Sequence, residues 1–282
     1  MPSRSSYLAA ALLLAGTSLS VAPARAAEAQ DILVTTPLKV EKFIPLAEIN
    51  QHPEIRVVMP EAVDPLAIYS DITTFTGQAF AQGAATGGIT RMVMDDVTFT
   101  TDPAVGGVTV MRFSVANLNA GTISVRPRVR FWNADGAPLG AGLPNGPGTY
   151  YAPGGVAQGF TFNAIAFGAG VTTVTSAPLA TPMPIPAGTT TTLWAGITFD
   201  NNAGATGATD ADLSNFGQGM FTPVDVGSST NTLFETTAAG SFFNTNNPPG
   251  AALNFGGSPV ANQGWELVVT TLPVELSGFS VE

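Results

Sequence analysis

The sequence predicts an all-β protein, a jelly-roll-like antiparallel sandwich with an extended arm at its N-terminus. Short runs rich in Val, Ile, Thr and Phe recur along the chain, separated by clusters of Gly, Pro, Asn and Asp. Helical periodicity is almost absent and no fixed-length repeat occurs, which argues against a solenoid or a propeller. Of the 282 residues, 45% are hydrophobic and 17 are Phe, so the chain can bury a large core.

Residues 1–26 have the features of a secretion signal. Arg4 supplies a positive start, residues 7–22 are apolar, and residues 24–26 form a small-x-small cleavage site. No later run approaches the roughly 18 apolar residues that a membrane-spanning helix needs. We therefore expect secretion to the extracellular space or cell surface, with the periplasm as the alternative, and no transmembrane segment in the mature chain.

Residues 27–65 differ in composition from the rest of the chain. They hold both lysines and the only histidine, His52, together with several prolines. This pattern predicts an extended arm or linker, with one strand at 55–59. The sandwich domain is predicted to span 66–271, followed by a C-terminal strand or tail at 272–282.

The predicted strands follow one another from residue 66. Each is rich in β-branched or aromatic residues and is bounded by turn-forming residues. They are expected at 88–100, 107–119, 122–132, 157–168, 191–200, 231–243, 264–271 and 274–281. Pro127 has no N–H to donate, so it predicts either an edge strand or a bulge within 122–132.

The strand 122–132 carries a row of arginines. Because side chains alternate along a strand, Arg126, Arg128, Arg130 and Trp132 share the face opposite the aliphatic residues. The arginines are candidates for binding acidic polysaccharide through bidentate hydrogen bonds. The alternative, which the acidic surplus favours, is pairing with the protein's own carboxylates, Asp95 included.

Trp132 and Trp194 both lie opposite the main aliphatic rows of their strands. In that position they are candidates for stacking against sugar rings. The alternative is that both rings pack in a core with apolar contacts on two sides.

Asp95 is the most informative acid in the chain. Within 88–100 it falls on the same face as Val93, Val97 and Phe99, where burial of an unpaired carboxylate is costly. An arginine, several backbone donors or a metal ion would offset that cost. Asp95 and its neighbour Asp96 are therefore candidate metal ligands.

A second candidate metal site is the turn that starts at Asp200, with Asp200 and Asn202 as ligands. Calcium is the predicted ion for both sites, because it accepts carboxylate, amide and carbonyl oxygens without strict geometry. Asp71, Asp102 and Asn201 are also chemically suitable. The competing interpretation of residues 200–202 is an ordinary Asp-Asn turn.

Residues 209–217 predict a short helical turn beside that site. Thr209 suits the N-cap, Asp210 and Asp212 suit the first turn, where the helix dipole favours negative charge, and Gly217 suits the position after the helix. These two acids then have structural roles.

Charge and residue types exclude several classes of function. The net charge is −10; removal of Arg4 and Arg25 leaves 8 basic and 20 acidic residues, or −12. Such acidity disfavours nucleic acid and anionic membrane surfaces as partners. There is no Cys and a single His, and no phosphate loop or Gly-x-Ser-x-Gly elbow occurs, so thiol, catalytic-zinc and nucleotide chemistry have no support.

Several phrases together resemble a group of secreted bacterial proteins of uncharacterised activity, found with PEP-CTERM/exosortase-type sorting. These are "YSDITTFTG", "VMDDVTF", "SVANLNAGTISVRPRVRFWNADG", "WAGITFDNNAGATGA", "TTAAGSFF" and "NFGGSPVANQGWE". The resemblance covers residue 69 onward and implies an extracellular β-sandwich, with no catalytic residues to carry over. The chain departs from the group in lacking a PEP-CTERM tail, so anchoring by a sorting enzyme is not predicted.

The predicted function is a secreted, non-catalytic structural or binding module, with extracellular polysaccharide or other surface proteins as partners. One alternative is a carboxylate-dependent polysaccharide hydrolase that draws on Asp95, Asp96, Asp200, Glu235 or Glu266. Another is a subunit of a surface layer or filament, because the strand-like stretch at 274–281 can add to the edge of another sheet.

Overall fold

The computed structural model describes residues 32–51, 62–85, 87–101, 105–156, 158–186, 188–236, 246–255, 257 and 260–271. The predicted secretion signal, His52, the predicted strand at 55–59, Asp102 and the predicted strand at 274–281 lie outside the described residues. Across the described ranges, no helix is long and apolar enough to cross a membrane.

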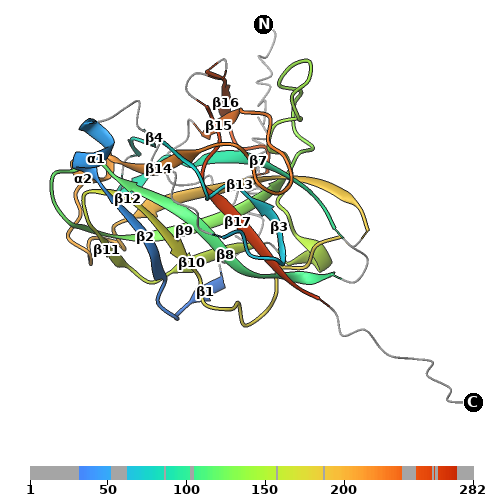
Figure 1. Ribbon diagram of the computed structural model, residues 1–282, viewed down its shortest axis with the longest axis horizontal. Helices are drawn as coiled ribbons and strands as arrows, with labels where there is room; N and C mark the ends of the chain where they lie inside the picture. The colour runs from blue at the N-terminus through green and yellow to red at the C-terminus, as the bar shows by residue number, and fades with distance from the viewer. Residues whose placement is uncertain are drawn as a thin grey trace, which may run out of the picture.

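Two β-sheets pack face to face, which confirms the predicted all-β sandwich (Figure 1). Sheet A has the order β1 (Ile32–Val34), β10 (Gly159–Phe162), β9 (Ile123–Asn133), β13 (Thr190–Asp200), β7 (Val93–Thr100), β15 (Leu233–Thr236) and β16 (Gly250–Leu253). The short strands β11 (Ile165–Phe167), β6 (Ile89–Thr90) and β5 (Ala84–Ala85) pair with β9, β13 and β6, respectively.

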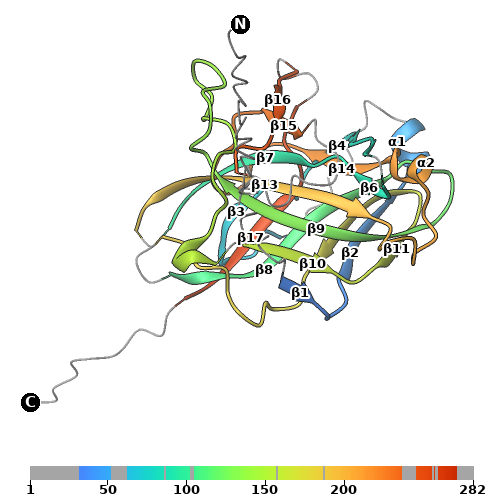
Figure 2. The ribbon, with the colours of Figure 1, turned by 180° about the vertical axis from the view of Figure 1, so that it is seen from behind.

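Sheet B has the order β2 (Lys39–Pro45), β12 (Gly170–Thr175), β8 (Val105–Asn117), β14 (Phe216–Phe221) and β4 (Phe75–Ala81). β17 (Trp265–Thr271) pairs with β8 and with β3 (Ala67–Ser70). The helices α1 (Leu46–Gln51) and α2 (Asp210–Leu213) lie at one end of the sandwich, and β17 leads out at the other (Figures 1 and 2). A 3-10 turn, Pro153–Gly155, precedes β10.

The main core lies between the sheets, and the chain crosses repeatedly from one sheet to the other between β7 and β17. Inward residues of both sheets contact one another, as in the Phe113–Phe162 and Phe131–Trp265 ring pairs at 5.6 and 6.4 Å. A second, smaller apolar cluster lies on the other face of sheet A and includes Trp132 and Trp194. Sheet A is therefore covered on both faces in this region.

Part of the segment predicted as an arm belongs to the two sheets. β1 pairs in parallel with β10 in sheet A, and β2 pairs with β12 in sheet B. The chain thus joins both sheets before residue 66.

β9 is an interior strand, so the edge-strand alternative for Pro127 is wrong and the bulge alternative holds. Thr161 pairs with Arg128 and Ile165 with Val125, so the neighbouring chain has three residues between these pairs (162 to 164) where β9 has two (126 and 127). The extra residue interrupts the ladder beside Pro127, where β9 has no N–H to give.

The predicted helical turn is confirmed at its start and wrong at its end. Thr209 is the N-cap, and its side chain and that of Asp212 form a capping box. The helix ends at Leu213, and Gly217 is already part of β14. A Cβ atom at this position would collide with the backbone carbonyl of Phe80 in the paired strand β4. Gly217 is therefore required for close strand packing and does not end the helix.

Candidate functional site

The arginine row of β9 meets an acid from the neighbouring strand. Arg126 pairs directly with Asp200 of β13, and its Nε and one terminal nitrogen each donate to an Asp200 oxygen at 2.8 Å. Arg128 approaches the same carboxylate at 3.5 Å. The structure therefore shows the second alternative, in which the arginines pair with the protein's own acids. The acid is Asp200 and not Asp95.

Arg130, the third arginine, is 1% exposed, so the row does not continue along the surface. Its guanidinium lies 5.2 Å from the centre of the Tyr150 ring, a cation–π contact. Burial lowers the pKa of Arg130 to about 10.

Trp132 and Trp194 form a directly opposed cross-strand pair, and both are fully buried. Their rings contact Tyr150 at 5.8 Å and Phe234 at 6.0 Å, respectively. Trp194 Nε1 also donates to the carbonyl of Asn145 at 2.8 Å. The two-sided core is therefore the correct alternative, because the loop after β9 and strand β15 cover the rings that were candidates for sugar stacking.

Asp95 and Asp96 of β7 are both buried and are held by neutral donors. Asp95 accepts from the backbone N–H of Gln263 at 2.6 Å, and Asp96 from the N–H and hydroxyl of Thr230 at 3.0 and 2.9 Å. The Ser229 hydroxyl lies 3.2 Å from an oxygen of each. Of the three predicted ways to offset the burial of Asp95, the structure shows backbone donors, here joined by hydroxyl groups, and none of these bonds comes from an arginine.

Burial raises the pKa of both carboxyl groups. Desolvation and the charge of Asp96 raise the pKa of Asp95 well above its usual value, while desolvation raises the pKa of Asp96 to about 6. The hydrogen bonds oppose this effect without cancelling it. The protonated form of the pair is therefore favoured far more than in an exposed turn.

Tyr69 and Asp71 extend this polar group into the core from β3 and the residue after it. Both are fully buried, and among the described residues neither the Tyr69 hydroxyl nor the two Asp71 oxygens have a hydrogen-bond partner. Burial and the charge of Asp95 raise the pKa of both side chains. Sequence reasoning named Asp71 only as chemically suitable and missed Tyr69. Tyr69 and Asp71 are two residues apart, so their side chains share one face of an extended chain. This spacing is the sequence signal that the two groups lie together.

The four predicted metal ligands lie in two separate places. Ala195 of β13 is opposite Asp95, and Asp200 is five residues farther along, about 16 Å at strand spacing. Asn202 has a φ of 52° and donates its N–H to Asp200 at 2.9 Å, which is the geometry of a turn. Across the described ranges, no three acidic or histidine side chains are arranged to hold an ion.

The other acids considered for hydrolysis have partners of their own. Glu266 is buried and accepts from Arg112 and from the Ser70 hydroxyl. Glu235 pairs with Arg91 at 3.2 Å.

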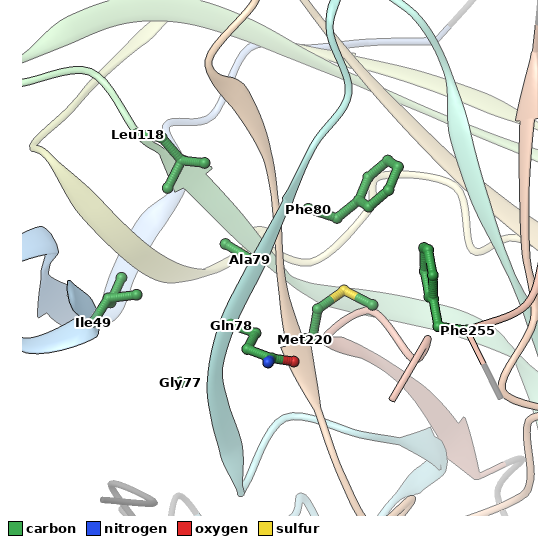
Figure 3. A pocket seen from close by; sticks show the side chains of 8 residues that line it. All are labelled: Ile49, Gly77, Gln78, Ala79, Phe80, Leu118, Met220 and Phe255. Atoms are coloured by element: carbon green, nitrogen blue, oxygen red, sulfur yellow. The ribbon is translucent and has the colours of Figure 1, made fainter. Parts of the chain in front are cut away.

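A groove of about 440 Å³ lies along β4, and sequence reasoning missed it (Figure 3). Ile49, Gly77, Gln78, Ala79, Phe80, Leu118, Met220 and Phe255 line it. None of these residues is titratable, so the groove suits apolar contacts rather than acid–base chemistry. The signal for it in the sequence is the uncharged strand "FTGQAFA".

In comparisons with known proteins, no family model, curated protein or solved structure matched the chain.

Proposed function

We propose that this chain is a non-catalytic extracellular module that acts by binding or by building structure. The observation that carries the proposal is the groove along β4, a concave apolar surface without a titratable side chain. Uncharged concave surfaces bind other molecules through shape and apolar contact. The extracellular location in this proposal is based on the predicted secretion signal.

The positions of the polar side chains support the same proposal. Arg126 and Arg128 face Asp200, Asp95 and Asp96 are held by backbone and hydroxyl donors, and the tryptophans are buried. A hydrolase of the carboxylate type requires two acids facing a substrate cleft, roughly 5 to 9.5 Å apart. The five acids considered for that role lie within ion pairs or the core, away from the groove.

Incubation of the secreted chain with soluble and insoluble polysaccharides tests the proposal. We expect no release of reducing ends, and any co-sedimentation is expected to be unchanged by Asp95→Asn. Mass spectrometry of the exported protein tests cleavage before Ala27. Turnover that Asp95→Asn abolishes would overturn the proposal in favour of the hydrolase.

A further inference from the structure

β4 is the last strand of sheet B, and one side of it is open among the described residues. On its other side it pairs with β14, where Gln82 N–H donates to the Phe216 carbonyl. Hydrogen-bonding groups alternate along an antiparallel strand, so the backbone groups of Ala79 and Ala81 face the open side. An open edge of this kind can accept another strand.

The groove has apolar walls on both faces of this edge. Ile49 and Leu118 belong with Ala79 to the cluster on the outer face of sheet B, whereas Met220 and Phe255 pack with Phe80 on the opposite face. Figure 3 shows Ile49 and Leu118 on one side of β4, and Met220 and Phe255 on the other. An extended chain that added to β4 would therefore place both of its faces against apolar side chains.

The opposite edge of the same sheet is protected by charge. β2 carries Lys39, Glu41 and Lys42, and Lys39 pairs with Glu41 at 3.1 Å. Charged side chains are a common way to keep edge strands from pairing with other molecules. β4 has no charged residue, so unlike β2 it is an edge of sheet B that is open to pairing.

Residues 274–281, "VELSGFSV", match the groove in pattern. In an extended conformation Val274 and Leu276 share one face, and Phe279 and Val281 share the other. Each face of such a strand thus carries two apolar side chains, as the two-walled groove requires.

The same segment cannot reach the groove of its own molecule. β17 ends at Thr271, which pairs with Val105 at the start of β8, whereas Leu118 of the groove follows the end of β8. The 13 residues of β8 span about 40 Å, and the three steps from Thr271 to Val274 cover only about 11 Å. Figures 1 and 2 likewise place the end of β17 opposite α1, which contributes Ile49.

We propose that residues 274–281 of one copy add as a strand to the open edge of β4 in a second copy. The end of β17, after which the donor segment follows in the sequence, and the groove lie at opposite ends of the sandwich, so the contact is heterologous and extends into a chain of copies. This inference rests on the proposed structural or binding function and gives it a partner, a second copy of the chain.

Complementation between two full-length variants tests the proposal. Ala79→Pro removes an N–H that faces the open edge while leaving the donor segment intact. Phe279→Glu places a charge in the donor segment while leaving the groove intact. In sedimentation velocity, wild type is expected to form assemblies that grow with concentration, and each variant alone is expected to remain a single copy. An equimolar mixture is expected to form dimers and nothing longer.

A labelled peptide with the sequence LPVELSGFSVE supplies a second measurement. We expect Phe279→Glu chain to bind it, and the Phe279→Glu/Ala79→Pro chain to bind it at least tenfold more weakly. Gln78→Glu, an exposed isosteric change in the groove, is expected to weaken binding severalfold by repelling the peptide's Glu residues. Asn145→Asp, the same change in an exposed loop, is the matched control and is expected to have no effect.

These outcomes test strand addition between copies independently of the proposed non-catalytic function. Strand addition is supported if the mixture forms dimers and if peptide binding depends on β4. Equal peptide binding with and without Ala79→Pro, or assembly of either variant alone, would overturn it and leave a non-catalytic module that uses another contact. Polysaccharide turnover would overturn the proposed function whatever the assembly state.

Discussion

Residues of one type on one strand face have different environments, which are set by their neighbours in space. Arg126 meets Asp200, whereas Arg130 meets the Tyr150 ring and is buried. The alternation of β9 was predictable because it depends only on strand geometry. The register that places Asp200 beside Arg126 was not, because it depends on which strand becomes the neighbour.

Asp200→Ala tests the importance of that pair. We expect a loss of about 2 kcal/mol in the free energy of unfolding, because two partly buried arginines lose their acid and the Asn202 N–H loses its acceptor. Urea denaturation measures it. Glu235→Ala is the control: its partner Arg91 is 48% exposed, so a loss below about 1 kcal/mol is expected. Equal losses would mean that the Asp200 pair has no special role.

At the scale of the element, local signals worked where the contacts are local. The Thr209 cap was predictable because a few consecutive residues determine it, and the interruption of the ladder at Pro127 was predictable because proline has no N–H. Gly217 was misassigned because its partner, the carbonyl of Phe80, is far away in the sequence. The sequence could not decide between an exposed and a buried position for Trp132 and Trp194 for the same reason, since a loop and a strand that are distant in the sequence cover them.

Thr209→Ala is expected to lower the free energy of unfolding by about 1 kcal/mol. The Thr209 side chain accepts from the N–H of Asp212, and this cap holds α2, where Asp210 binds the N–H of Gly88 at 2.9 Å. Chemical denaturation measures the change. Thr209→Ser keeps the acceptor and is expected to retain most of the stability; a Ser variant as unstable as the Ala variant would contradict the capping role.

For the whole molecule, the buried acids of the core link folding to pH. Asp71, Asp95 and Asp96 have raised pKa values in the folded state, so the folded state binds protons more tightly than the unfolded one. Their contribution to stability is complete below the usual pKa near 4. It is lost as pH rises through about 6, the pKa of Asp96, and beyond.

We therefore expect a higher melting temperature at pH 5 than at pH 8 in the presence of a chelator. For Asp96 alone the shift to about 6 corresponds to about 3 kcal/mol over the whole titration, of which about half is lost between pH 5 and pH 8. Asp96→Asn imitates the protonated form and is expected to flatten the pH dependence. Calcium in place of the chelator tests the predicted ion, because a bound ion would raise the melting temperature at pH 8. A melting temperature that rises from pH 5 to pH 8 with chelator present would contradict the linkage.

Local patterns in the sequence were enough to predict the fold class, about half of the described strands, which side chains share a strand face, and the cap of α2. These follow from alternation, turn residues and local hydrogen bonds, which act over a few neighbouring positions. Only the tertiary structure decided that the tryptophans are buried, that Asp200 pairs with Arg126, and that β4 is an uncharged open edge beside a groove. Those features depend on which distant strands become neighbours, and the pairing of strands is a property of the folded chain as a whole.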